Sequence, residues 1–196
     1  MPHITKVLVF FCTTLISSLS LAQDCNKSIK STTPTPTPNL LMPDENRFKL
    51  EGESMVSKGK IKVPNGTLLD TKTGWLWKKC SEGQSGTGCT GSSLQYTRQQ
   101  ALEKAKSVNN EGFAGYKDWR VPTVKELASI VERQCIRPAI NLTLFPNTPS
   151  DIFWTSEPYS DRTRHAWYFN LSHGYHDWSF NKDSLYSVRL VRGRQW

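Results

Sequence analysis

Few side chains in this sequence have the types and the spacing that metal binding requires. His173, His176 and Asp177 lie close together near the C-terminus and are all possible metal ligands by type. On a strand, however, residues three apart point to opposite faces, so His173 and His176 would not converge on one ion. We therefore predict a polar hairpin tip at this position and no metal site.

The sequence shows no clear signature of a catalytic centre either. The sequence contains no G-x-S-x-G, H-E-x-x-H or phosphate-loop motif. A carboxylate pair of the glycosidase kind would need two acidic residues at a set separation, which the sequence leaves open. The candidates for such a pair are Asp118, Glu157, Asp161, Asp177 and Asp183. We predict no catalytic residue, no cofactor and a protein that is not an enzyme.

The cysteines have the number and spacing of structural disulfides. Cys12 falls in a predicted signal peptide, which leaves Cys25, Cys80, Cys89 and Cys135. Four cysteines in an exported chain allow three pairings. Cys80 and Cys89 flank a flexible Ser/Gly-rich loop that suits a local bridge, and Cys25 would then pair with Cys135. Two bridges would leave no thiol nucleophile, and the spacings are not those of a zinc site.

The N-terminus has the organisation of an export signal. Met1 and Lys6 give a positive start, residues 7–16 form an apolar run, and Ser20-Leu21-Ala22 fits a signal-peptidase site. We predict a signal peptide over residues 1–22, with a retained N-terminal anchor as the alternative. No other segment is long and apolar enough to span a bilayer, so we expect no membrane insertion after signal removal. The predicted location is the periplasm, the cell surface or the medium.

The charge balance favours an anionic partner. The chain carries 25 Lys and Arg against 17 Asp and Glu, a formal net charge of +8. Such a surface attracts acidic polymers and sulfated sugars, although it could also serve solubility alone. The basic residues are dispersed, with no run of five or six, and together with export this argues against a nucleic acid partner.

The last third of the chain holds most of the candidate binding residues. Most of the seven tryptophans should be core, but a few exposed aromatic rings could stack on sugars. Arginine supplies paired donors to sulfate or carboxylate groups. Arg189 alternates with Val188 and Leu190 and could instead be a buried structural residue. The predicted ligand surface consists of Arg162, Arg164, Lys182, Arg189, Arg192 and Arg194, with Tyr159, His165 and Trp178 as stacking partners.

These side chains require a scaffold of short strands and two helices. An N-terminal arm with a Thr/Pro-rich spacer over residues 23–45 precedes one domain over residues 46–196. Strands placed before and after a helical pair favour an α+β fold. Alternating patterns predict strands over residues 67–70, 74–78, 152–155, 166–171, 175–180 and 186–192, with a tight turn at His173-Gly174.

Two capping boxes mark the predicted helix starts. Thr97-x-x-Gln100 begins one helix, and Thr123-x-x-Glu126 begins the other. The second helix should bury a stripe at helical spacing. This stripe consists of Val124, Leu127, Ala128 and Val131. Asp118-Trp119-Arg120, just before this helix, could hold an internal salt bridge.

Several ordered segments together resemble a bacterial family, the domain named after the C-terminal part of the Legionella collagen-like adhesin. Each segment is short, but their order along residues 46–196 is specific. The segments are residues 65–84, Cys89-Thr90-Gly91, 113–135, 138–159, 166–174 and 188–193. Many such sequences also carry an early cysteine and one after the second helix, which supports the pairing of Cys25 with Cys135.

The resemblance implies a C-type lectin-like fold, stapled by disulfides, that packs two helices on short antiparallel sheets. It also implies binding of sulfated polysaccharide on a basic surface, in a homo-oligomer such as a trimer. This chain has no collagen-like repeat, and Tyr159 follows Glu157-Pro158 where calcium-dependent lectins carry Asn. No calcium-sugar site is therefore expected.

Three hypotheses of function result. The leading one is an exported, non-catalytic binding module with adhesin-like recognition of anionic, sulfated glycans. The alternative is a protein–protein component of an envelope or surface assembly. The third is an enzyme of the formylglycine-generating type, whose fold is related but whose reactive cysteines come late in the chain, where this sequence has none after Cys135.

Overall fold

The computed structural model describes residues 47–50, 63–160, 165–179 and 181–193. The signal peptide, the arm and the spacer were predicted over residues that lie outside these ranges. The same holds for Cys25, Arg162, Arg164 and Arg194. The described part is a mixed α+β structure with two sheets and two α-helices, which confirms the α+β part of the predicted fold class.

The smaller sheet has four strands that pair antiparallel, in the order β1-β2-β3-β9. A tight turn joins β2 to β3, where Gly74 adopts a φ of +76° and its N–H donates to the Asp70 carbonyl. A positive φ of this size favours glycine because it has no Cβ. The strands are Phe48–Leu50 (β1), Thr67–Asp70 (β2), Leu76–Lys78 (β3) and Val191–Arg192 (β9).

The larger sheet has five strands in the order β4-β8-β5-β6-β7. All its neighbours pair antiparallel except β5 and β8, which run parallel, so the prediction of purely antiparallel sheets was wrong for this pair. The strands are Gln95–Tyr96 (β4), Ile152–Pro158 (β5), Ala166–Asn170 (β6), Tyr175–Ser179 (β7) and Tyr186–Ser187 (β8).

The strand predicted over residues 186–192 is divided between the two sheets, so that prediction was wrong. Its first two residues form β8 in the larger sheet and its last two form β9 in the smaller one. Between them, the carbonyls of Val188 and Leu190 accept hydrogen bonds from the N–H groups of Glu82 and Lys78. The segment therefore crosses from one sheet to the other while its backbone stays paired.

Both helices begin where the capping boxes predicted. Thr97 caps α1 (Arg98–Glu111), and Gly112 ends it in the left-handed conformation. Thr123 caps α2 (Val124–Ser129), and the Glu126 carboxylate accepts a hydrogen bond from the Thr123 N–H. These reciprocal bonds satisfy N–H groups that have no partner within a helix.

The predicted buried face of the second helix was partly wrong. The helix ends at Ser129, so Val131 lies beyond it and forms a β-bridge with Ile140. Ala128 is exposed, and the buried residues of the helix are Glu126 and Leu127. Glu126 is buried because its carboxylate binds the Arg120 guanidinium, and this partner is not visible in the hydrophobic pattern.

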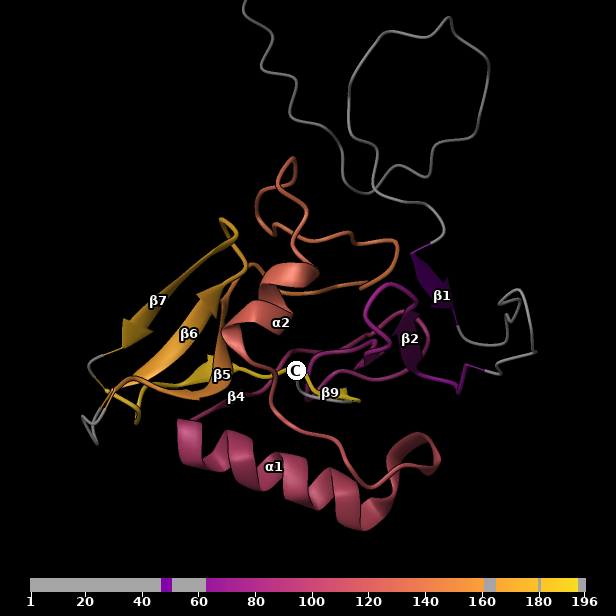
Figure 1. Ribbon diagram of the computed structural model, residues 1–196, viewed down its shortest axis with the longest axis horizontal. Helices are drawn as coiled ribbons and strands as arrows, with labels where there is room; N and C mark the ends of the chain where they lie inside the picture. Colours follow the sequence, from indigo (N-terminus) through magenta and orange to yellow (C-terminus); the bar gives the residue numbers. More distant parts are fainter. Residues whose placement is uncertain (1–46, 51–62, 161–164, 180, 194–196) are drawn as a thin grey trace, which may run out of the picture.

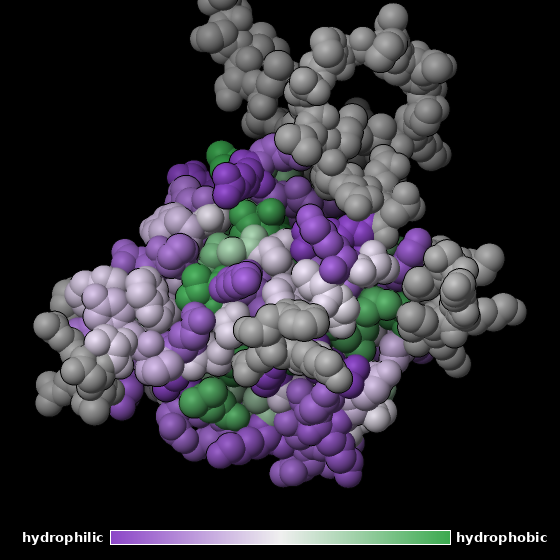
Figure 2. Space-filling model, in the orientation of Figure 1, coloured by the Kyte–Doolittle hydropathy of each residue, from purple (hydrophilic) through white to green (hydrophobic). Residues whose placement is uncertain are grey.

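The two helices cover opposite faces of the larger sheet (Figure 1). Neighbouring residues of β5 point to opposite faces, so Trp154 packs in the core beneath α1 and Phe153 in the core beneath α2. Buried residues of the smaller sheet join both cores, among them Leu76 on the α1 side and Trp77 on the α2 side. On the face drawn in Figure 2, hydrophilic residues predominate and the hydrophobic ones form small separate patches.

A disulfide joins Cys80 to Cys89, as predicted, and closes the disulfide loop (residues 80–89). Cys135 is disulfide-bonded as well, and its predicted partner Cys25 lies outside the described ranges. No helix in the described part of the chain is long and apolar enough to cross a membrane.

Candidate functional site

The β6–β7 hairpin places aromatic side chains in register on one face. Trp167 is directly opposite Trp178, and Phe169 is opposite His176. The turn between the strands is closed by the Gly174 N–H, which donates to the Asn170 carbonyl at 2.9 Å. This bond fixes the register, and a shift by one residue would move every ring to the other face.

The short helix α2 covers only part of this face. Near the turn, Phe169 and Leu171 are buried in the core that Leu127 of α2 also joins. Toward the other end of the hairpin, Trp167 and Trp178 are half-buried and belong to neither core. The uncovered part of the face therefore carries two tryptophans side by side.

Tyr159, just past the end of β5, completes this group of rings. Its ring stacks on Trp178 with centroids 4.8 Å apart and planes at 24°, and its centroid lies 5.1 Å from that of Trp167. The Tyr159 N–H donates to the His165 carbonyl at 3.4 Å, which holds the two residues together. The His165 ring centroid lies 5.3 Å from that of Trp178.

We call this cluster the aromatic platform, consisting of Tyr159, His165, Trp167, His176 and Trp178. Four of its members are half-buried, and His176 is exposed. Aromatic pairs in such geometries contribute about 0.5–1.5 kcal/mol each beyond the burial of area. Clustered aromatic rings left at a surface characterise binding sites, because they supply a large and rigid apolar area to a partner.

Positive charge next to the larger sheet comes from the predicted residue Lys182 and from Arg98, which was not predicted. Lys182 is exposed in the connection between β7 and β8, and its carbonyl accepts from the Arg98 N–H. The Arg98 side chain donates to the Ser156 carbonyl of β5 at 2.8 Å. Burial lowers the pKa of Arg98 below its usual value.

Arg189 was predicted to belong to an exposed ligand surface, and that prediction was wrong. Its side chain is fully buried, the alternative that its position between Val188 and Leu190 had indicated. The guanidinium donates to the carbonyls of Lys78 and Lys79 and to the hydroxyls of Ser81 and Thr148. Burial lowers its pKa to about 9, while the charge of Glu82 acts in the opposite direction, so the group stays charged at neutral pH.

Arg192 lies on the smaller sheet, apart from the aromatic platform. Its guanidinium pairs with Asp118 at 2.7 Å and lies 3.6 Å from the centroid of the Tyr116 ring. The salt bridge predicted within residues 118–120 is therefore replaced by two others, because Arg120 pairs with Glu126 and not with Asp118. Of the predicted ligand residues that the structure describes, it brings together Tyr159, His165 and Trp178.

Sequence reasoning did not include Trp167 and His176 in this site. The sequence did contain a feature that could have identified them, because the turn at His173-Gly174 fixes which residues of the two strands are opposite each other. Counting outward from that turn pairs Trp167 with Trp178. Among the described residues, no group of three or more His, Cys, Asp or Glu side chains could hold a metal ion.

Comparison with known protein families identifies this domain. The model of the Lcl C-terminal domain family matches residues 66–192, which include every ring of the aromatic platform, both helices and the disulfide loop. A search of curated proteins found no match to the chain.

Proposed function

Because this chain belongs to the Lcl C-terminal domain family, a family of surface-associated modules, we propose that it recognises sulfated glycans through the aromatic platform. In this proposal the protein is an exported, non-catalytic binding module with a C-type lectin-like fold, located in the periplasm or at the cell surface. The disulfide between Cys80 and Cys89 supports this location, since such bonds persist in oxidising compartments.

The observation that carries the proposal is the stack of Tyr159 on Trp178 beside Trp167. Half-buried rings that already pack against one another lose little conformational freedom when a ligand covers them. Their faces and edges suit the apolar C–H face of a sugar ring.

Positive charge next to the rings would supply the preference for sulfated sugars. Arg162 and Arg164 fall between Tyr159 and His165 in the sequence, and the rings of those two residues lie 5.9 Å apart. Charge-assisted, paired hydrogen bonds from arginine to sulfate are strong and geometrically specific.

Heparin affinity chromatography tests the proposal. We expect the variants Arg162→Ala/Arg164→Ala and Tyr159→Ser to elute at lower salt than the wild type. The matched control is Arg133→Ala/Lys72→Ala, which removes two positive charges from exposed residues, one beyond the end of α2 and one in the β2–β3 turn of the smaller sheet. We expect this control to elute with the wild type. Equal losses in both double variants would indicate attraction by net charge alone, and elution of the wild type with a non-binding protein would refute the glycan proposal.

A protein partner is the second candidate, favoured by two exposed apolar side chains. Ile136 is 66% exposed and Tyr175 is 48% exposed. They lie at the same end of the molecule, since the Arg137 N–H donates to the carbonyl of Ser172 in the β6–β7 turn. In this case Ile136→Ser, and not Tyr159→Ser, would weaken association with the envelope fraction. The trimer implied by the family resemblance stays a prediction, which sedimentation of the exported protein would test.

A further inference from the structure

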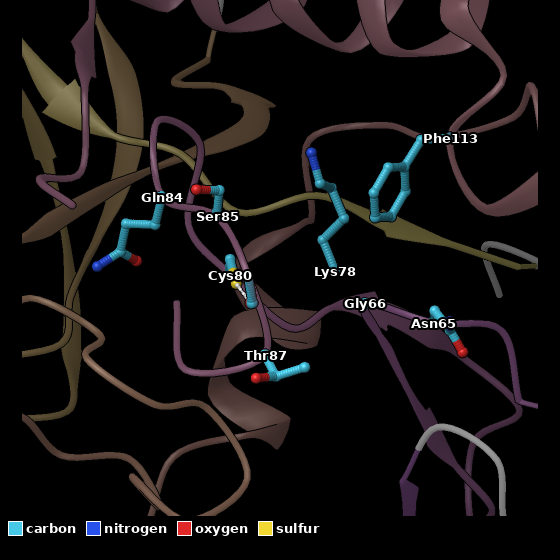
Figure 3. A pocket seen from close by; sticks show the side chains of 9 residues that line it. Asn65, Gly66, Lys78, Cys80, Gln84, Ser85, Thr87 and Phe113 are labelled. Atoms are coloured by element: carbon cyan, nitrogen blue, oxygen red, sulfur yellow. Dashed lines mark hydrogen bonds between the residues drawn. The ribbon is translucent and has the colours of Figure 1, made fainter. Parts of the chain in front are cut away.

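The structure contains a pocket that is separate from the aromatic platform. It has a volume of about 480 Å³ and lies between the turn before β2, the end of β3, the disulfide loop and Phe113 (Figure 3). Phe113 begins a 3-10 helix, η1 (Phe113–Gly115), that follows α1. No residue of the aromatic platform lines the pocket, and its size is within the range of small-molecule sites.

Phe113 gives the pocket an apolar wall that is held in place. The Trp119 and Phe113 rings pack in a T-shaped arrangement with centroids 5.5 Å apart, and the Trp119 indole N–H donates to the Phe113 carbonyl at 2.9 Å. Gly66 allows the close approach of this ring, because a Cβ there would lie 3.1 Å from the ring carbon Cζ. The Cys80–Cys89 disulfide borders the pocket on another side.

The single charged residue that lines the pocket already has a counter-ion. The Lys78 Nζ lies 2.6 Å from the Glu82 carboxylate and 4.4 Å from the centroid of the Phe113 ring. The two side chains are only 14% and 3% exposed. A cation that is paired and largely buried has little remaining attraction for an anion, so the pocket does not favour a sulfated or acidic ligand.

Polar groups without charge form the rim of the pocket. Asn65, Ser85 and Thr87 are exposed and line it, and together they offer an amide and two hydroxyl groups. Figure 3 shows Ser85 and Thr87 on the disulfide loop, with Lys78 and Phe113 on the facing side. The loop is fixed by the disulfide and by two backbone bonds between Ser85 and Thr90.

We propose that this pocket binds one uncharged pyranose ring. The apolar face of the sugar would pack against the Phe113 ring and the aliphatic part of the Lys78 side chain, whose ammonium lies over that ring. The sugar hydroxyl groups would exchange hydrogen bonds with Asn65, Ser85 and Thr87. An apolar ring wall with a few fixed polar groups that determine orientation is the usual composition of a small-ligand site. The protein would then carry two sites of different chemistry, one for sulfated chains and one for a neutral sugar unit.

Amide chemical shifts measured during titration with N-acetylglucosamine test this proposal on the exported protein. We expect saturable shifts at the amides of Gly66, Ser85 and Gly86, with a millimolar dissociation constant. Thr87→Trp should abolish them, because the indole would fill the pocket from its exposed rim. Thr143→Trp is the matched control, since Thr143 is also exposed and does not line the pocket, and it should leave the shifts unchanged.

Three results would overturn the proposal. They are no saturable shift at these amides, identical titrations for the wild type and Thr87→Trp, or shifts at these amides with sodium sulfate and not with the sugar. Heparin retention separates this proposal from the first one. Thr87→Trp should elute from heparin with the wild type, so loss of the sugar-induced shifts and loss of heparin retention can be observed independently.

Discussion

At the scale of single residues, Arg189 organises the polar interior of the molecule. Its guanidinium joins the carbonyls of Lys78 and Lys79, at the end of β3, to the hydroxyls of Ser81 and Thr148. Its carbon Cζ lies 4.8 Å from the centroid of the Phe145 ring. These bonds connect the base of the disulfide loop to a segment far along the chain. A buried polar group of this kind stabilises a fold only while all its partners remain bonded.

We expect Arg189→Met to lower the free energy of unfolding by about 2–4 kcal/mol, because it leaves several buried acceptors without a donor. Urea denaturation followed by tryptophan fluorescence measures this loss. Arg192→Met is the control, because Arg192 pairs with an aspartate that is 56% exposed. Such exposed pairs contribute at most about 1 kcal/mol. Similar losses in both variants would contradict the structural role given to Arg189.

Sequence pattern could indicate the location of Arg189 but not its partners. Its position between two apolar residues left burial open, whereas the density of arginine in the last third favoured a surface role. The acceptors lie 41 to 111 positions away in the chain, and local patterns do not contain such pairings. The stacking group of Tyr159, His165 and Trp178 could be proposed from residue type, although only the structure brings the three rings together.

At the scale of elements, the two helices share a capping sequence but differ in what surrounds the cap. Gln100 of α1 is exposed, and its side chain accepts a hydrogen bond from the N–H of its own N-cap residue, Thr97. Glu126 of α2 is also the third residue after its N-cap, but it is buried. Its carboxylate accepts from both terminal nitrogens of the Arg120 guanidinium, at 2.6 and 2.7 Å. The second cap is therefore also an ion pair that connects α2 to the chain preceding it.

Alanine substitution should distinguish capping alone, at Gln100, from capping combined with an ion pair, at Glu126. We expect Glu126→Ala to cost about 3–5 kcal/mol, since it removes one partner of a buried pair. Gln100→Ala should cost no more than about 1 kcal/mol, as an exposed capping residue does. Thermal unfolding monitored by circular dichroism compares the two, and a Gln100→Ala variant as unstable as Glu126→Ala would disprove this distinction.

The start of each helix was predictable because capping depends on residues three apart. The end of α2 was not, because it depends on packing against the β-bridge between Val131 and Ile140. The early end is not what leaves Trp167 and Trp178 half-buried, because the chain that follows α2 lies at the β6–β7 turn. A Cβ on Gly174 in that turn would lie 2.9 Å from Val131.

At the scale of the whole molecule, the disulfide loop lies where several distant segments meet. Its backbone bonds to the segment after β8 through Glu82, and Asn147 donates a side-chain bond to the Gly88 carbonyl. The loop also forms one side of the pocket beside Phe113. Much of its order depends on the bond between Cys80 and Cys89.

We expect Cys80→Ala/Cys89→Ala to lower the free energy of unfolding by about 2–3 kcal/mol, from the greater freedom of the unfolded chain. The same variant should lose the N-acetylglucosamine shifts while it keeps heparin retention, because the aromatic platform lies on the other sheet. Differential scanning calorimetry and the two binding assays measure these effects. Unchanged stability together with unchanged sugar binding would show that the loop is ordered without its crosslink.

The fold class was predictable from the order of strand and helix patterns, but the sheet topology was not. Residues 186–192 have one uninterrupted alternating pattern, and nothing within it marks the point where the chain leaves one sheet for the other. That point is determined by β3 and β4, which lie about a hundred residues earlier.

The division of residues 186–192 between both sheets has a consequence for the order of folding. β8 is the only link between β4 and β5 in the larger sheet, and β9 completes the smaller one. A nascent chain that stops before Tyr186 can form the β2–β3 and β6–β7 hairpins but neither complete sheet. Stable protection of backbone amides in both sheets should therefore arise together, in a single late step, once this closing segment has emerged from the ribosome.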